Sequence, residues 1–191
     1  MSELVKAVVI GASAGGVEAL TALLPGLPKN FPLPIAIVLH VPPDRRSLLV
    51  DVFQYRCAME VREAEDKAEV QPGTIYFAPP DYHLLFETEH SFSLSVDQQV
   101  NHSRPSIDVL FESAAEAFGP HLLALLLSGS NADGANGIAK ICAAGGSAAV
   151  QDPQTAIAPE MPKAGLDACA KAQSMSLHEM AELLQRAGGV R

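Results

Sequence analysis

Apolar residues along this chain fall either into short continuous runs or into runs with helical spacing. The continuous runs are typical of buried strands, and the spaced runs are typical of amphipathic helices. Their regular alternation predicts an α/β fold, a three-layer αβα sandwich whose sheet is mostly parallel and doubly wound, with a short antiparallel section. We interpret residues 1–191 as a single domain, because 191 residues fit one domain better than two.

The predicted strands are β-rich runs bounded by Pro, Gly or Asp, and they cover residues 5–10, 35–41, 59–64, 74–78, 83–87, 91–96, 122–127 and 147–150. The predicted helices have apolar residues on one face, and they cover residues 17–24, 47–55, 106–118, 138–144, 162–170 and 177–186. We expect antiparallel pairing among the last of the middle strands. The run at 122–127 is apolar throughout, which predicts a central strand buried on both faces.

Two turns of small residues follow predicted strands. Residues 11–15, GASAG, fit the pattern G-x-S-x-G, in which small neighbours let a tight strand-to-helix bend present the hydroxyl of Ser13. The same turn could instead hold a phosphate, because N–H groups at a helix N-terminus attract anions. The second turn, SGSNADGANG at 128–137, follows the buried strand.

Three chemically reactive residue types lie where predicted strands end. Ser13 follows the first strand, His40 lies at the end of the second, and Asp133 lies in the second small-residue turn. Functional groups of open α/β sheets gather at the carboxyl ends of the strands. An imidazole can take the proton of a serine hydroxyl, and a carboxylate can fix the imidazole tautomer. The three residues therefore predict a nucleophile, a base and an orienting acid.

The pattern disfavours two common alternatives. Ordinary α/β-hydrolases carry Ser, then the acid, then His, whereas the order here is Ser, His, Asp. GASAGG departs from the dinucleotide fingerprint G-x-G-x-x-G, and the second strand ends in His40 rather than in a ribose-binding acid. A non-catalytic alternative stays open for each residue alone, because Ser13 and Asp133 could cap helices and His40 could be a core histidine.

Composition narrows the class of protein. A formal charge of −9 opposes binding to nucleic acid or anionic membranes. Apolar runs are too short to cross a bilayer, and no signal-peptide pattern opens the chain. Cys57, Cys142 and Cys169 are odd in number and lack C-x-x-C spacing, which predicts neither a disulfide framework nor a zinc site. We expect a cytoplasmic protein.

The sequence resembles the chemotaxis protein-glutamate methylesterases, the CheB catalytic domain, over nearly its whole length. The matching motifs are IGASAGG at 10–16, LH at 39–40, REAED at 62–66, PGTIYFAPPDYH at 72–83, RPSIDVLF at 104–111, LLSGSNADGANG at 126–137, and QD, T and MP at 151, 152, 155, 161 and 162. The resemblance implies the αβα fold, a catalytic triad of Ser13, His40 and Asp133, and hydrolysis of glutamate γ-methyl esters, with deamidation of glutamines. It implies no metal or organic cofactor.

The same resemblance suggests further site residues. The backbone N–H of Ser130 would help bind the oxyanion, at a position where the family usually has methionine, together with an N–H at Ala14 or Gly15. His83 would line or brace the cleft. Independently of the resemblance, Arg45 and Arg46 follow the His40 turn and could steer an acidic receptor helix, although a charge pair at a helix start is usually only solvated.

The implied partners are methylated cytoplasmic receptor helices and a separate phospho-receiver protein or sensor kinase. The family usually carries an N-terminal receiver domain, whereas the first strand here begins near residue 5, so we expect a free-standing esterase or a piece of a longer chain. Two other functions stay open. The chain could be a non-catalytic receptor- or kinase-binding module, which the Ser130 substitution favours, or an esterase of small molecules.

Overall fold

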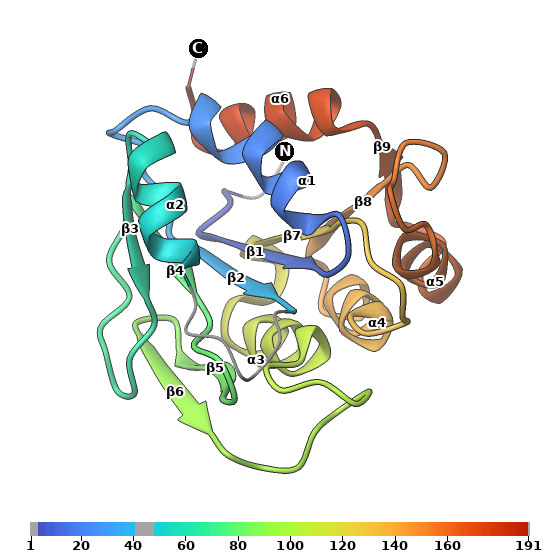
Figure 1. The fold of residues 1–191 in the computed structure, drawn as a ribbon, viewed down its shortest axis with the longest axis horizontal. Helices are drawn as coiled ribbons and strands as arrows, with labels where there is room; N and C mark the ends of the chain where they lie inside the picture. The colour runs from blue at the N-terminus through green and yellow to red at the C-terminus, as the bar shows by residue number, and fades with distance from the viewer. Residues whose placement is uncertain (1–3, 41–47, 191) are drawn as a thin grey trace.

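The computed structural model describes residues 4–40 and 48–190 and has three layers, with helices on both faces of a seven-stranded sheet (Figure 1). The strands are β1 (Ala7–Ala12), β2 (Ile35–Leu39), β3 (Glu60–Glu63), β4 (Thr74–Phe77), β5 (His83–Thr88), β6 (Ser91–Ser95), β7 (Leu122–Leu126), β8 (Ser147–Gln151) and β9 (Gln173–Met175). The helices are α1 (Gly16–Leu23), α2 (Leu49–Arg56), α3 (Ile107–Phe118), α4 (Ala135–Ala143), α5 (Glu160–Ala168) and α6 (Leu177–Ala187), with short 3-10 turns at Leu24–Gly26 and Gly119–His121. The predicted fold class is confirmed.

The large sheet is parallel and doubly wound. Its strand order is β3-β4-β2-β1-β7-β8-β9, so the chain leaves β1 toward β2 on one side and later returns to β7 on the other. The strand order therefore reverses at β1, where open α/β sheets place their functional sites. Strands β5 and β6 pair antiparallel, as the sequence predicted, and β5 packs against α3.

The core has two halves, one on each face of the sheet. Along β1 the side chains alternate, so that Val8 and Ile10 join one half and Ala7 and Val9 the other. Helices α1, α2 and α6 cover the first half, and α3, α4 and α5 cover the second. Every residue of β7 is buried, which confirms the central strand expected at 122–127 and explains why its sequence is continuously apolar.

Several boundaries differ from the prediction. Strand β2 ends at Leu39, and α2 begins at Leu49, while residues 41 and 47 lie outside the described ranges. Helix α4 begins at Ala135 rather than at 138, because residues 135–137 already take helical geometry although their small, turn-like sequence resembles a loop. Strand β9 was not predicted, since it is three residues long, largely polar and at the sheet edge. In the described ranges, no helix is long and apolar enough to cross a membrane.

The cysteine prediction was wrong about disulfides, because one pair is bonded. Cys142, in α4, and Cys169, directly after α5, form a disulfide across a Cα–Cα distance of 6.7 Å. They are 27 residues apart and meet because α4 and α5 pack side by side, a contact that cysteine spacing does not reveal. Cys57 is buried with a free thiol, and burial raises its pKa.

Close packing of α3 on α4 requires a glycine at position 137, where an added Cβ would overlap the Cβ of Phe111. We expect Gly137→Ala to lower the free energy of unfolding by about 1–2 kcal/mol, because overpacking outweighs the gain in helix propensity. Urea denaturation measures this change. The control is Gly26→Ala, where the nearest atom lies 3.9 Å from the added Cβ. Equal stability of the Gly137→Ala variant and the parent would contradict the packing argument.

Candidate active site

The carboxyl ends of β1, β2 and β7 bring the three predicted residues to one edge of the sheet. Ala12 pairs with Leu39 in the parallel register of β1 and β2, so Ser13 and His40 are the next residues on neighbouring strands. The pairing continues one step further, because His40 N donates to the carbonyl oxygen of Ala12 at 3.1 Å. Neighbouring strands lie about 4.8 Å apart. The sheet itself therefore sets the serine beside the histidine.

The turn that carries Ser13 is anchored through its backbone. Ser13 N donates to the Ser128 carbonyl at 2.9 Å, and the Ser13 carbonyl accepts from Gly16 N at 2.8 Å. The N-cap of α1 is Gly15, in the left-handed region at φ 78°, so Ser13 does not cap this helix. A side chain at position 15 would collide with Ile157 and with the hydroxyl of Ser128. Within residues 4–40 and 48–190, the Ser13 hydroxyl makes no hydrogen bond, including none to His40.

His40 and Asp133 form a buried pair. His40 Nε2 lies 2.8 Å from Asp133 Oδ2, with the imidazole 13% exposed and the carboxylate fully buried. Because a carboxylate only accepts, Nε2 carries the proton, and Nδ1 is left with the lone pair that a general base needs. Asp133 does not cap the helix that follows it, since the N-cap of α4 is Gly134 without a side-chain bond.

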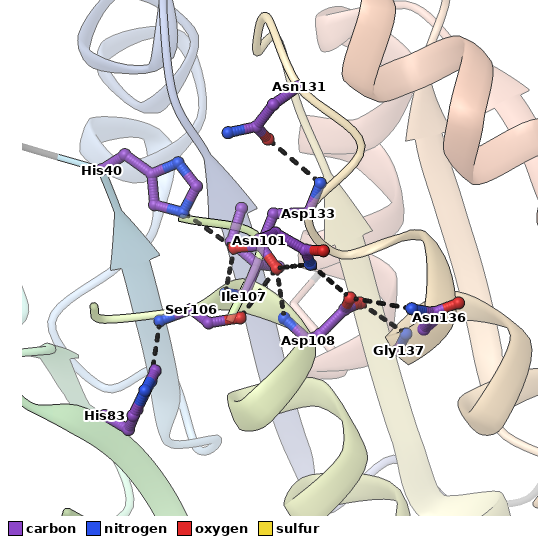
Figure 2. A network of polar contacts seen from close by, with 10 residues as sticks. All are labelled: His40, His83, Asn101, Ser106, Ile107, Asp108, Asn131, Asp133, Asn136 and Gly137. Atoms are coloured by element: carbon purple, nitrogen blue, oxygen red, sulfur yellow. Dashed lines mark hydrogen bonds and ion pairs between the residues drawn. The ribbon is translucent and has the colours of Figure 1, made fainter. Parts of the chain in front are cut away.

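Asp133 instead caps a different helix, α3, from across the sheet edge. Its carboxylate accepts from Ile107 N at 2.7 Å and Asp108 N at 3.1 Å, the first free N–H groups of α3 (Figure 2). Ser106 Oγ donates to it at 2.7 Å and Asn101 Nδ2 at 2.9 Å. With His40, five donors surround one carboxylate, and the positive end of α3 adds to their field.

These donors keep Asp133 ionised. Burial by itself raises the pKa of its carboxyl, but the hydrogen bonds from His40, Asn101, Ile107 and Ser106 outweigh burial and hold that pKa below its ordinary value. The carboxylate can therefore fix the His40 tautomer across the neutral range.

A second buried carboxylate, that of Asp108, lies beside the first and is 1% exposed. It accepts from Gly137 N at 2.8 Å, from Asn101 Nδ2 at 2.8 Å and from Asn136 Nδ2 at 3.3 Å. Burial raises the pKa of Asp108, and the nearby charge of Asp133 adds to the rise. Sequence reasoning placed Ser106 and Asp108 at the start of the helix predicted at 106–118, within the RPSIDVLF motif, but it assigned neither of them, nor Asn101, to the site.

The remaining predicted residues have different surroundings. His83 is 2% exposed, donates from Nε2 to the Gln98 carbonyl at 3.0 Å, and accepts from Ser106 N at Nδ1 at 3.2 Å. Both ring nitrogens are thus engaged within the protein, and His83 braces the segment that holds Ser106 (Figure 2). Arg45 lies outside the described residues.

Three backbone N–H groups near Ser13 are candidates for binding an oxyanion. In the described part of the chain, the N–H groups of Ala14, Gly15 and Ser130 make no hydrogen bond. Ala14 and Ser130 are exposed, and Gly15 is half-buried. Across the described ranges, no group of His, Cys, Asp and Glu side chains could hold a metal ion.

The segment after β8 holds the two turns together. Ser128 N donates to Gln151 Oε1 at 2.9 Å, and Ser128 Oγ donates to the Ala14 carbonyl at 2.7 Å. Ala158 N donates to Ser128 Oγ at 2.9 Å, and Gly129 N donates to the Ala158 carbonyl at 3.0 Å. The Ser13 turn, the end of β7 and residue 158 therefore form one hydrogen-bonded unit.

The chain matches a known protein family over most of its length. Residues 8–184 match the CheB methylesterase family. The chain belongs to that family. A protein of Leptospira interrogans with the provisional name protein-glutamate methylesterase/protein-glutamine glutaminase is 44% identical over 95% of this chain and 94% of its own length.

The CheB-family likeness extends to structure. The crystal structure of the Thermotoga maritima CheB methylesterase catalytic domain matches with a TM-score of 0.90 and 34% identity, over 96% of this chain and 99% of that domain. The Thermotoga maritima protein-glutamate methylesterase/protein-glutamine glutaminase is 37% identical over 85% of this chain, but the match spans only 48% of that protein. The chain thus corresponds to the catalytic domain of these relatives.

Asp133→Asn tests how much the five donors stabilise the CheB-family fold. At about pH 7 we expect the free energy of unfolding to fall by about 3 kcal/mol, because the amide cannot accept all these bonds. The pKa of Asp133 is lower in the folded protein than in the unfolded chain, where it is about 3.9. The stabilisation that the ionised carboxylate provides is therefore complete above about pH 3.9 and is lost as the pH falls through the folded pKa. Urea titrations at about pH 7 and about pH 3 should show the difference shrinking.

Asp108→Asn is the control with the opposite sign. Because burial raises the pKa of Asp108, its ionisation lowers stability as pH rises from about 3.9 through the folded pKa. The free energy of unfolding of the parent, relative to that of the Asp108→Asn variant, should therefore fall as the pH rises, whereas relative to the Asp133→Asn variant it should rise. A common pH trend in both variants would contradict the assigned environments.

Proposed function

We propose that this protein is a serine hydrolase that demethylates glutamate γ-methyl esters, and deamidates glutamines, on chemoreceptors or receptor-like signalling proteins. The observation that carries the proposal is the His40–Asp133 pair at 2.8 Å, set next to Ser13 by the register of β1 and β2. The names of the relatives supply the substrate class.

The proposed reaction has two steps. Ser13 Oγ attacks the ester carbonyl, His40 Nδ1 takes the hydroxyl proton, and the tetrahedral intermediate collapses as methanol leaves with that proton. His40 then takes a proton from water, which attacks the glutamyl-serine ester, and the free glutamate and the Ser13 hydroxyl are restored. A glutamine substrate would release ammonia in place of methanol. Asp133 holds the imidazole and stabilises its protonated form throughout.

The oxyanion would lie against main-chain donors. Ala14 and Gly15 follow Ser13 in its turn, and Ser130 lies two residues after Ser128, whose carbonyl accepts from Ser13 N. Within the described ranges their N–H groups have no partner, and such donors depend on backbone position rather than on side chain. A serine at position 130 therefore leaves this donor in place. Its neighbour Gly129 is held by Ala158, which fixes the turn from which the Ser130 N–H projects.

We further propose that the protein acts in the cytoplasm, where the receptor helices of the resembling family carry their methyl esters. A separate phospho-receiver protein or a sensor kinase would be its regulatory partner. These partners follow from the family alone.

Ser13→Ala tests the nucleophile. We expect methanol release from methylated receptor fragments to fall by about 10⁴-fold or more, because no hydroxyl remains to form the acyl-enzyme. Gas chromatography of methanol measures the rate. The control is Ser147→Ala, an exposed serine that begins β8 at the opposite end of the sheet. Equal release by the Ser13→Ala variant and the parent would contradict the mechanism.

A fluorophosphonate probe distinguishes the other candidate functions. Labelling of the parent but not of the Ser13→Ala variant would support a serine hydrolase. Absence of labelling with intact receptor binding would instead indicate the non-catalytic module. Faster turnover of small chromogenic esters than of methylated peptides would indicate the small-molecule esterase.

Ser130→Pro tests the oxyanion donor. Proline removes the N–H and so should lower kcat by about 10²–10³-fold, while Ser130→Ala, which keeps the N–H, should stay within about threefold of the parent. Steady-state methanol release measures both, and thermal unfolding confirms that each variant is folded. Similar rates for the two variants would exclude the Ser130 N–H as a donor.

A further inference from the structure

Asn101 lies between the two buried carboxylates of the site. Its Nδ2 donates to Asp133 Oδ1 at 2.9 Å and to Asp108 Oδ2 at 2.8 Å (Figure 2). Asn101 is exposed, whereas the carboxylates beneath it are fully buried and 1% exposed. The amide thus covers both acids from the solvent side.

The orientation of this amide is fixed by its partners. A carboxamide nitrogen carries two N–H groups, and both are used, one for each carboxylate. The flipped orientation would set the amide oxygen against two acceptor oxygens. Asn101 therefore supplies one neutral N–H donor to each of two neighbouring carboxylates, which repel each other when both are ionised.

The backbone around Asn101 is built to present this amide. Val100 and Ser103 exchange two hydrogen bonds at 3.1 and 2.9 Å, and the two residues between them, Asn101 and His102, have φ values of 51° and 61°. Two consecutive left-handed residues form a turn of the I′ type, in which Asn is favoured. The position therefore accepts Asn or Gly without strain.

Further contacts hold the whole connection between β6 and α3. Arg104 donates to the carbonyls of Val96 and Asp97 at 2.9 and 3.0 Å and pairs with Asp81 at 2.7 Å. His83 contacts both the Gln98 carbonyl and Ser106 N. The turn is thus tied at both ends, and its amide is preorganised over the acids.

We propose that Asn101 is a positioning residue of the hydrolytic site, which keeps Asp133 Oδ2 directed at His40 by satisfying Asp133 Oδ1 and separating its charge from Asp108. The inference rests on the proposed function. In the described ranges Asn101 makes no hydrogen bond to the imidazole or to Ser13, so it would act through the two aspartates.

The charges around the pair set the direction of the expected effect. Within the described ranges, Asp133 pairs with His40 at the end of β2, and both aspartates interact with Glu112 on α3. Glu112 in turn interacts with Glu116 on the same helix and with Lys140 on α4. Without the amide, the two acids repel more strongly and bind protons more readily. An unshielded Asp133 also favours the protonated imidazole, which cannot act as a base. As the pH is lowered, the variant should therefore lose activity at a higher pH than the parent does.

Asn101→Gly is the decisive variant, because glycine keeps the left-handed backbone and removes only the amide. We expect the acid limb of the kcat/KM profile for methanol release to move up by about half a pH unit or more. The plateau rate should fall about tenfold, because Asp133 is less well positioned. The matched control is His102→Gly, in the same turn, whose side chain makes no hydrogen bond within the described ranges; it should leave both the acid limb and the plateau unchanged.

Two readouts keep this test separate from the proposed substrate. The pH dependence of Ser13 labelling by a fluorophosphonate should shift in the same direction as the methanol profile. NMR titration of the His40 imidazole, which needs no activity, should show its midpoint shifted upward in the Asn101→Gly variant. A shift by NMR without methanol release from the parent would support the positioning role and refute the substrate.

An unshifted profile and an unshifted imidazole titration in the Asn101→Gly variant would overturn the inference. So would a loss of rate that follows thermal stability alone, with the pH profile of the parent retained. Asn101→Asp gives an independent check, because a third acid at this position should shift the acid limb further than glycine does.

Discussion

The contact between the Asp133 carboxylate and the N-terminus of α3 is the interaction on which the site depends. Asp133 belongs to the turn after β7, yet it satisfies the first N–H groups of α3 and the imidazole that follows β2. One carboxylate thus joins three segments that are far apart in the sequence. A helix needs acceptors for its first N–H groups, and a buried carboxylate needs donors, so each group satisfies the hydrogen bonds of the other. The same carboxylate therefore orients the His40 imidazole, as the proposed mechanism requires.

The parallel sheet supplies the other half of the arrangement. Register between β1 and β2 fixes Ser13 beside His40 before any side chain is considered. The central strand β1 is also where strand order reverses, so the turn after β7 arrives from the opposite side with Asp133. Small residues then let the layers approach. Gly137 allows α4 to come close enough to Phe111 on α3 for its own N–H to reach Asp108, which brings the second acid into the network.

Sequence patterns predicted the parts of this structure that arise from local periodicity. Runs of apolar residues located the buried strands, and strand ends pointed to Ser13, His40 and Asp133, because parallel strands deliver their carboxyl ends to one edge. The acid network around Asn101 and Asp108 was out of reach, since each of its bonds to Asp133 spans 25 residues or more. The disulfide was not predicted for the same reason, because its two cysteines meet only through the packing of α4 on α5. Strand β9 and the first turn of α4 lacked any apolar pattern.

The backbone of Ser13 is bonded on both sides, to the end of β7 through its N–H and to the start of α1 through its carbonyl. Ser13, the proposed nucleophile, therefore extends the sheet rather than belonging to a free loop. Its only remaining freedom is rotation of the hydroxyl among the staggered rotamers of one side-chain torsion. The backbone bonds therefore fix the Cα of Ser13, whereas the position of its Oγ depends on this torsion and on neighbouring exposed residues such as Ile157.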